Sequence, residues 1–212
     1  MRSRVLGAAA AVAGLGAFGL AAAGCADGSA SPSRTVAHDR AGHGVITGRP
    51  TVGTRGSFGP GCDRMPATGP GSIDDMASAR VVAAVRRSRL LTEIAHAIMA
   101  AGLTRSLNSA KAITIFAPED SAFVALGRGN LTTLLADKSD LTKMLKYHVV
   151  SGRHTPAELA SGRRLTTLLG TVIVPRELRG QYRVNNAQVV CGNIQTANAT
   201  IYIVNKVVVP IP

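Results

Sequence analysis

The sequence predicts an α+β domain in which helices pack over a mostly antiparallel β-sheet. Three observations predict this fold class. Apolar residues recur at helical spacing through much of the chain before Leu165, one short β-branched and aromatic run interrupts them at Ile113–Phe116, and the apolar period shifts towards two after Leu165. The 212 residues contain no internal repeat and leave room for one such domain with extensions.

The first residues have the composition of an export signal. Arg2 and Arg4 precede an uncharged run, Val5–Ala26, that is rich in Ala and Gly. The run is weakly hydrophobic, which favours a processed signal over an uncleaved membrane anchor. Two processing sites compete. Ala21-Ala22-Ala23 fits an ordinary signal peptidase, whereas Ala22-Ala23-Gly24-Cys25 resembles a bacterial lipobox, in which the cysteine receives the lipid.

The cysteine count favours the lipoprotein. An exported chain with three cysteines, Cys25, Cys62 and Cys191, needs a use for the odd one. Lipidation of Cys25 leaves an even pair in an oxidising compartment, where a disulfide persists. We therefore expect a signal peptide at residues 1–24 and a lipid anchor at Cys25 on the outer face of the cell membrane, with a secreted form as the alternative.

Residues 25–61 have the composition of a disordered tether, because they are rich in Gly, Ser, Pro, Thr, Arg and His and lack an apolar period. His38, Asp39 and His43 lie in this segment. Three such side chains in a flexible, basic stretch make a weak ligand set, so we expect a solvated linker and no metal site. The folded domain is expected at residues 62–212.

A strand, a sharp turn and a helix are expected between residues 113 and 123. The β-branched start of this stretch suits a buried strand, and Pro118 ends the strand because it lacks an N–H group and disfavours the α region at the residue before it. Asp120 or Ser121 is placed to accept from the first free N–H groups of the helix that follows.

The other helices are located by caps and apolar spacing. Ser72 and the acidic residues after it predict one helix start, and Gly102 predicts the end of a helix whose apolar face runs from Leu91 to Ile98. Thr155-Pro156-Ala157-Glu158 is a capping box with Pro at the first helical position. Two more short helices are expected at Leu131–Leu135 and Asp140–Leu145.

Strands dominate the C-terminal part, where Gly, Pro and Asn residues, Pro175 among them, separate short apolar runs. Tyr147–Val150 also has strand-like residues. The strands expected after it are Leu165–Leu168, Thr171–Val174, Tyr182–Val184, Gln188–Cys191, Ile194–Thr196 and Thr200–Val209.

Four segments resemble the signatures of the fasciclin (FAS1) domain, in the right order and with credible spacing. They are Thr114–Phe123, Leu145–Val150, Val184–Val190 and Tyr202–Pro210. Each segment alone is a weak signal, but the four together are specific. The resemblance covers roughly residues 62–212 and implies a single fasciclin domain with an α+β fold.

The cysteines narrow the resemblance further. Gly59-Pro60-Gly61-Cys62 and Val189-Val190-Cys191-Gly192 are similar to the paired-cysteine framework of the mycobacterial immunogenic fasciclin proteins, of which one branch is secreted and another is a cell-surface lipoprotein. The resemblance implies a disulfide between Cys62 and Cys191.

The chain also departs from the family pattern at three places. Asp120 and Asn205 stand where the family often has Asn and Asp respectively, and the dipeptide Asn198-Ala199 replaces a common Asn-Gly hairpin. Because Ala at positive φ is unfavourable, this last turn is expected to differ in type or to carry a small strain.

No enzyme signature stands out. Ser121 lacks a Gly-x-Ser-x-Gly context, and Gly127-Arg128-Gly129 is only a fragment of a phosphate loop. The net charge of +12 comes mainly from scattered Arg residues, and aromatic residues make up only 3%, so no stacking platform for nucleic acid is expected. We expect no catalysis, no cofactor, no metal and no nucleic-acid partner.

Tyr147 and His148 are the candidate partner-binding residues. In animal fasciclin proteins the corresponding region is implicated in adhesion, so the resemblance implies a protein, cell-surface or matrix partner. In a strand the two side chains would point to opposite faces, which favours a structural role for one of them. The leading hypothesis is a lipid-anchored cell-surface adhesion or protein-binding module. The alternatives are a small-molecule or lipid carrier with an apolar groove and a structural envelope protein held by its positive charge.

Overall fold

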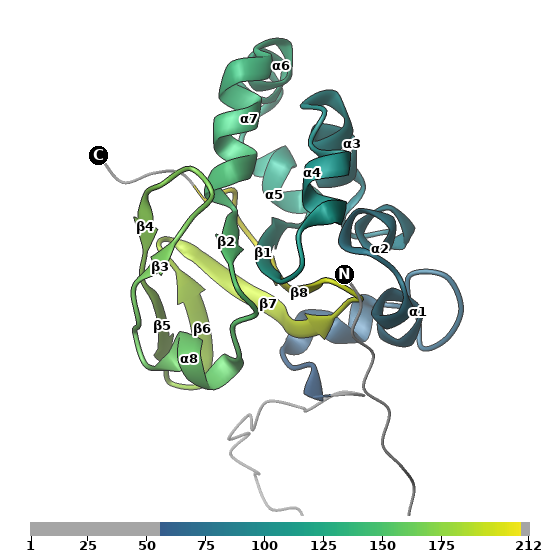
Figure 1. The fold of residues 1–212 in the computed structure, drawn as a ribbon, viewed down its shortest axis with the longest axis vertical. Coiled ribbons are helices and arrows are strands. Elements are labelled where there is room, and N and C mark those ends of the chain that lie inside the picture. Colours follow the sequence, from purple (N-terminus) through teal and green to yellow (C-terminus); the bar gives the residue numbers. More distant parts are fainter. Residues whose placement is uncertain (1–55, 209–212) are drawn as a thin grey trace, which may run out of the picture. The chain divides into compact units, whose positions relative to one another are not determined.

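The computed structural model describes residues 56–208, without the side chain of Arg128. Its main sheet has six strands in the order β2-β1-β8-β7-β6-β5, and β3 and β4 form a separate pair (Figure 1). Strands β1 and β8 are parallel, whereas all other neighbours are antiparallel. The strands are β1 (Ile113–Pro118), β2 (Val149–Ser151), β3 (Leu165–Thr166), β4 (Val172–Ile173), β5 (Pro175–Leu178), β6 (Gln181–Val184), β7 (Ala187–Gln195) and β8 (Ala199–Val204).

Most helices precede β2 in the chain, so the predicted α+β class is confirmed. Within residues 56–208 no helix has the length and apolar character needed to cross a membrane. The helices are a 3-10 helix η2 (Pro60–Arg64), α1 (Ile73–Ser78), α2 (Val81–Arg87), α3 (Thr92–Ala100), α4 (Thr104–Ser109), α5 (Asp120–Ala125), α6 (Arg128–Ala136), α7 (Lys138–Tyr147) and α8 (Pro156–Ala160).

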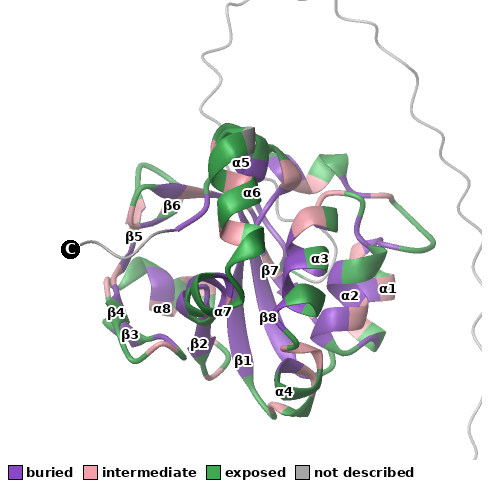
Figure 2. Cartoon of the chain, turned by 90° about the horizontal axis from the view of Figure 1, so that it is seen from above, coloured by how far each residue is buried: buried purple, intermediate pink, exposed green. Residues whose placement is uncertain are grey.

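Buried side chains form two clusters that share strands of the sheet. Ile115 belongs to the larger cluster, with α1 to α5 and α7, and its neighbour Phe116 belongs to the smaller one, with β3, β4, β6 and α8. This division follows from the alternation of side chains along a strand. Every residue of β1 and β8 is buried, and Figure 2 shows these strands beneath helices.

Asp120 caps a different helix from the one predicted. The N-cap of α5 is Glu119, whose side chain makes no capping bond, and Asp120 lies in the first turn of α5. Its carboxylate instead accepts a hydrogen bond from the backbone N–H of Glu93, at 2.9 Å, in the first turn of α3. The backbone N–H of Asp120 donates to the carbonyl of Leu90 at 3.0 Å. The turn after β1 is therefore bonded to the start of a helix that precedes it in the chain.

The predicted caps of two other helices are present. The side chain of Ser72 accepts from Asp75 N–H at the start of α1. Thr155 and Glu158 form the reciprocal capping box of α8. No local signal in the sequence predicted helix α4 or strand β5. Pro175 was expected to separate two strands, but it begins the edge strand β5, where a missing N–H costs no ladder bond.

The expected strands Gln188–Cys191 and Ile194–Thr196 form one strand, β7. Its register against β8 shifts twice, between Val189 and Cys191 and between Cys191 and Ile194. These irregularities explain why the sequence resembled two strands. The hairpin that follows differs in type from the common Asn-Gly turn, because Ala199 does not have a positive φ.

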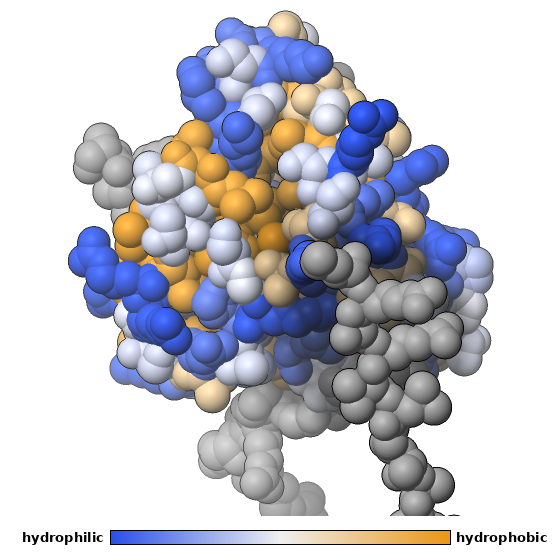
Figure 3. All heavy atoms as spheres, viewed as in Figure 1, coloured by the Kyte–Doolittle hydropathy of each residue, from blue (hydrophilic) through white to orange (hydrophobic). Residues whose placement is uncertain are grey.

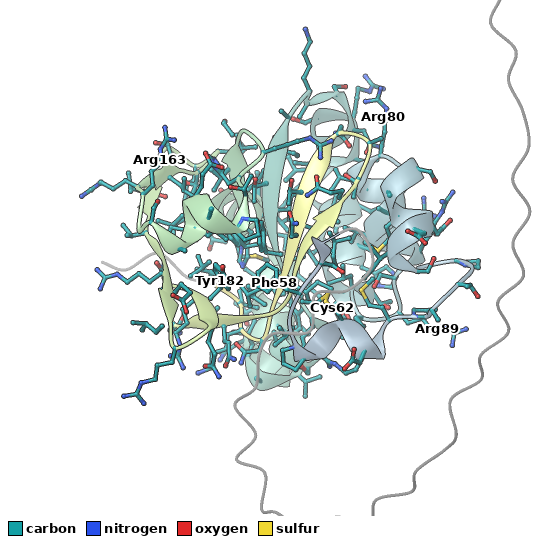
Figure 4. All side chains as sticks on the ribbon, turned by 90° about the horizontal axis from the view of Figure 1, so that it is seen from below. Phe58, Cys62, Arg80, Arg89, Arg163 and Tyr182 are labelled. Atoms are coloured by element: carbon teal, nitrogen blue, oxygen red, sulfur yellow. A yellow bond between two sulfur atoms is a disulfide. The ribbon has the colours of Figure 1, made fainter. Side chains whose placement is uncertain are left out.

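The segment that leads into the domain is fastened to β7. Phe58 and Gly192 exchange backbone hydrogen bonds of 3.1 and 2.8 Å, and Cys62 and Cys191 form the disulfide that the resemblance implies. The ring of Phe58 packs against Tyr182, with centroids 4.7 Å apart (Figure 4). The packed segment thus includes Phe58, which precedes the expected start at Cys62. The expected signal peptide, Cys25 and most of the expected tether lie outside the described residues.

Candidate functional site

Tyr147 and His148 end a helix and do not alternate in a strand as predicted. Tyr147 is the last residue of α7, His148 is its C-cap in the αR region, and β2 begins at Val149. The residues Tyr147 and His148 are only 3% and 1% exposed. The helix was expected to end at Leu145, because Val149-Val150 favours a strand, but it continues to Tyr147. Both side chains are buried in this arrangement.

The ring of His148 joins the end of α7 to the last described segment of the chain. Its Nδ1 lies 2.8 Å from the carbonyl oxygen of Met144, and its Nε2 accepts a hydrogen bond from the backbone N–H of Val208 at 2.9 Å. Because Val208 N–H can only donate, Nε2 carries no proton, and Nδ1–H donates to Met144.

Burial lowers the pKa of His148 to about 4, against the smaller opposing effect of its hydrogen bond to Met144. The imidazole is therefore neutral near pH 7. A proton on Nε2 would face the N–H of Val208 and would remove that hydrogen bond. The neutral ring is thus a structural clasp between two segments.

Tyr147 makes a second internal link. Its Oη lies 2.8 Å from the amide nitrogen of Asn185, which donates to it. Asn185 has a positive φ of 52° in the turn between β6 and β7, a conformation that Asn tolerates. The pair of predicted site residues therefore connects α7 with both the β6–β7 turn and the segment after β8.

A largely apolar groove lies directly beside this clasp. Its volume is about 440 Å³, and it includes both Met144 and Val208, the two residues that His148 bonds. Figure 3 shows apolar residues gathered near the lower end of α7 and the β3–β4 pair. The groove is lined by Leu126, Asn130, Leu134, Asp140, Lys143, Met144, Leu169, Val207 and Val208.

The charged residues of the groove neutralise each other. Lys143 Nζ lies 2.9 Å from Asp140 Oδ1, and both side chains are well exposed. An exposed pair of this kind contributes little to stability. The remaining lining is apolar apart from Asn130, so the groove suits apolar side chains or a hydrocarbon chain better than a charged ligand.

The sequence singled out Tyr147 and His148, which lie beside the groove, but it did not identify the groove's lining as a site. Leu126 and the run Leu131–Leu135 have helical apolar spacing, which predicts packing against a core. Nothing in that pattern tells which leucines stay uncovered, since this depends on how α6 sits against α7 and on the turn that carries Leu169. Cys25, the predicted lipidation site, lies outside the described residues.

Comparison with known proteins decides the family. The family model described as the fasciclin domain matches residues 89–210, which is more than half of the chain. The chain belongs to the fasciclin family. All four segments that resembled the fasciclin signatures lie within this match.

The fasciclin chain is also similar to mycobacterial antigens. It is 36% identical over 160 residues to the immunogenic protein MPB70 of Mycobacterium bovis, covering 72% of this chain and 81% of that protein. It is 33% identical over 161 residues to the cell surface glycolipoprotein MPB83 of the same organism, covering 72% of each. The predicted relation to mycobacterial fasciclin antigens is confirmed.

A solved structure supports the same fold. The FAS1 domain pair from the insect cell adhesion molecule Fasciclin I superposes with a TM-score of 0.55 at 15% identity, covering 64% of this chain and 52% of that chain. At this identity the likeness establishes the fold alone.

Proposed function

We propose that the chain is a lipid-anchored, non-catalytic fasciclin module that binds a protein or matrix partner at the cell surface. The apolar groove beside His148 carries the binding part of this proposal. A surface hollow with aliphatic walls offers a partner's apolar side chains a place to be buried, which is how most binding energy at interfaces arises. The relatives support the cellular location, since MPB83 is named a cell surface glycolipoprotein.

The groove offers little for catalysis. The titratable residues in its lining, Asp140 and Lys143, form an ion pair, and the nearby His148 is buried and neutral. General acid–base chemistry needs a titratable group within reach of a substrate proton. These observations support a binding role.

Cell or matrix binding by groove variants tests the proposal. Leu134→Glu and Leu169→Glu place a charge in the half-buried apolar lining, and each is expected to weaken binding about tenfold or more. Val124→Glu is the matched control, because Val124 is 77% exposed on α5 and does not line the groove. Urea unfolding of all three variants checks that they fold. Equal binding by the groove variants and the control would contradict the proposed site.

The anchor is proposed at Cys25, after a signal peptide at residues 1–24 and before a tether at residues 25–61. The disulfide between Cys62 and Cys191 supports it, since the chain has three cysteines and Cys25 is the one left over. Intact mass of the native protein is the test. A chain that starts at Cys25 with added acyl mass is expected, and a plain chain that starts at Gly24 would refute the anchor.

A small-molecule or lipid carrier is the second candidate, because the groove volume of about 440 Å³ lies in the range of small-molecule sites. The two functions differ in one measurement. A carrier purified from its own cells holds an extractable lipid or other apolar compound that Leu134→Glu removes, whereas an adhesion module holds none.

A further inference from the structure

Two arginines face each other across the β5–β6 hairpin. Arg176 of β5 and Arg183 of β6 are direct cross-strand partners, and both are exposed. Side chains in such a pair have Cβ atoms about 5 Å apart. A third arginine, Arg179, forms the two-residue turn with Gly180, where φ is 54° and 78° respectively. The hairpin therefore concentrates positive charge on one small surface.

This charge has no acidic partner among the described residues. No ion pair within 4.0 Å joins Arg176, Arg179 or Arg183 to any carboxylate between residues 56 and 208. Glu177 is the nearest acidic residue in the chain, but it alternates to the other face of the strand, and its carboxylate accepts from the backbone N–H of Gly180.

Protection of a sheet edge explains only part of this arrangement. A charge on an edge strand discourages pairing with other chains, and Arg176 lies on the edge strand β5. Arg183 lies on β6, inside the sheet, where no such protection is needed. Like charges directly opposite each other destabilise a sheet, and edge protection does not account for the second arginine.

Exposed aliphatic residues surround the arginine pair. A hollow of about 490 Å³ is lined by Val172, Val174, Arg176, Leu178, Arg183 and Asn185. Leu178 is 58% exposed beside the hairpin turn, and Val172 is 40% exposed. Aliphatic side chains next to guanidinium groups match a partner in which anionic groups lie next to hydrocarbon.

We propose that this face of the hairpin binds an anionic lipid surface. Arg176 and Arg183 hold lipid phosphate groups through the bidentate hydrogen bonds that guanidinium makes, and Leu178 with Val172 contacts the hydrocarbon at the headgroup boundary. This inference goes beyond the proposed function. It concerns a different surface from the groove and does not require the anchor at Cys25.

Two observations favour lipid over other polyanions. The aromatic ring of the hairpin, Tyr182, packs inward on Phe58 (Figure 4), so no ring is presented for stacking on sugars or bases. An acidic peptide that added as a strand to β5 would meet Pro175, which has no N–H to donate, and helix α8, which packs beside β5.

Vesicle cosedimentation of the exported full chain carrying Cys25→Ser, which cannot be acylated, tests the proposal. We expect binding to vesicles of phosphatidylcholine mixed with phosphatidylglycerol and none to phosphatidylcholine alone. Arg176→Gln with Arg183→Gln is expected to lower this binding about tenfold or more, because each basic residue near an anionic leaflet contributes to attraction. Leu178→Ser is expected to weaken binding without any change of charge.

The matched control removes the same charge elsewhere. Arg86 and Arg89 are exposed near the end of α2. Figure 4 shows Arg89 on the opposite side of the domain from Arg163, which follows helix α8, and α8 packs beside strand β5 of the hairpin. Arg86→Gln with Arg89→Gln is expected to retain vesicle binding. An equal loss in this control would mean that net charge alone drives binding, which overturns the proposal. Displacement by polyglutamate together with normal binding of Leu178→Ser would instead assign the surface to an acidic polymer.

Discussion

At the scale of single residues, His148 joins two segments with one neutral ring. Its folded pKa of about 4 lies below the ordinary 6.5, so the unfolded chain binds more protons between these values. The contribution of His148 to the free energy of unfolding is therefore fully present above about pH 6.5 and is lost as the pH drops towards 4. At about 1.4 kcal/mol per pH unit, the contribution of His148 declines by roughly 2 kcal/mol between pH 6.5 and pH 5.

Urea unfolding at pH 7.5 and pH 5 measures this loss. The variant His148→Gln is expected to be less stable at pH 7.5 but to lose less on acidification than the wild type. His96→Gln, which changes an exposed histidine, is expected to keep the wild-type pH dependence. The same acid loss in His148→Gln as in the wild type would assign the effect to other groups.

Gly192 is the residue that allows Phe58 to approach β7. A Cβ at this position would lie 2.6 Å from Phe58 Cζ and 2.8 Å from Tyr202 Cδ1. We expect Gly192→Ala to lower the free energy of unfolding by about 1–3 kcal/mol, as overpacking does. Gly129→Ala in α6, where a Cβ meets nothing within 4 Å, should be neutral or stabilising. Thermal unfolding of the two variants makes the comparison.

At the scale of elements, the turn after β1 depends on Asp120 as the acceptor for α3. Asp120→Ala leaves the N–H of Glu93 without its partner and should cost about 1 kcal/mol, as the loss of an N-cap does. Asp120→Asn keeps an acceptor oxygen and should stay close to the wild type. Chemical denaturation of both variants tests this, and equal losses would show that the carboxylate charge matters more than the hydrogen bond.

The same reasoning explains a departure from the family pattern. The amide oxygen of Asn205 accepts from the backbone N–H of Gln188 at 2.9 Å, a bond that a carboxylate could accept equally well. Asn198 is buried, where its amide accepts from Val81 N–H at the start of α2 and donates to the carbonyls of Leu107 and Ala110 around the end of α4. Short-range sequence reasoning assigned Asn198 to a turn alone.

The sequence predicted the elements better than their contacts. Local signals such as Ser72, Gly102 and the box at Thr155 act within one turn of helix, and the structure has a helix at each of them. The capping of α3 by Asp120 and the parallel pairing of β1 with β8 join residues far apart in the chain. No local pattern encodes such contacts.

At the scale of the whole molecule, the disulfide between Cys62 and Cys191 closes a loop with a sequence separation of 129. In the chain-entropy model this closure stabilises the fold by about 4–5 kcal/mol, an upper estimate. We expect Cys62→Ser with Cys191→Ser to lower the melting temperature strongly, and Cys25→Ser to leave it unchanged. Calorimetry with and without reductant measures both, and an unchanged melting temperature for the double variant would contradict the estimate.

The disulfide also fixes how the domain responds to mechanical tension. When the chain is pulled between the proposed tether and the segment after Cys191, the load passes from Cys62 through the disulfide into β7, so the helices and strands between the two cysteines are not extended. Only the stretch after Cys191 can lengthen, whereas the enclosed segment, with its separation of 129 residues, would add about 450 Å at ~3.5 Å per residue. Under a pull between the proposed tether and the segment after Cys191, the domain would therefore act as a short link, and the helices α6 and α7 that line the groove would lie outside the line of force.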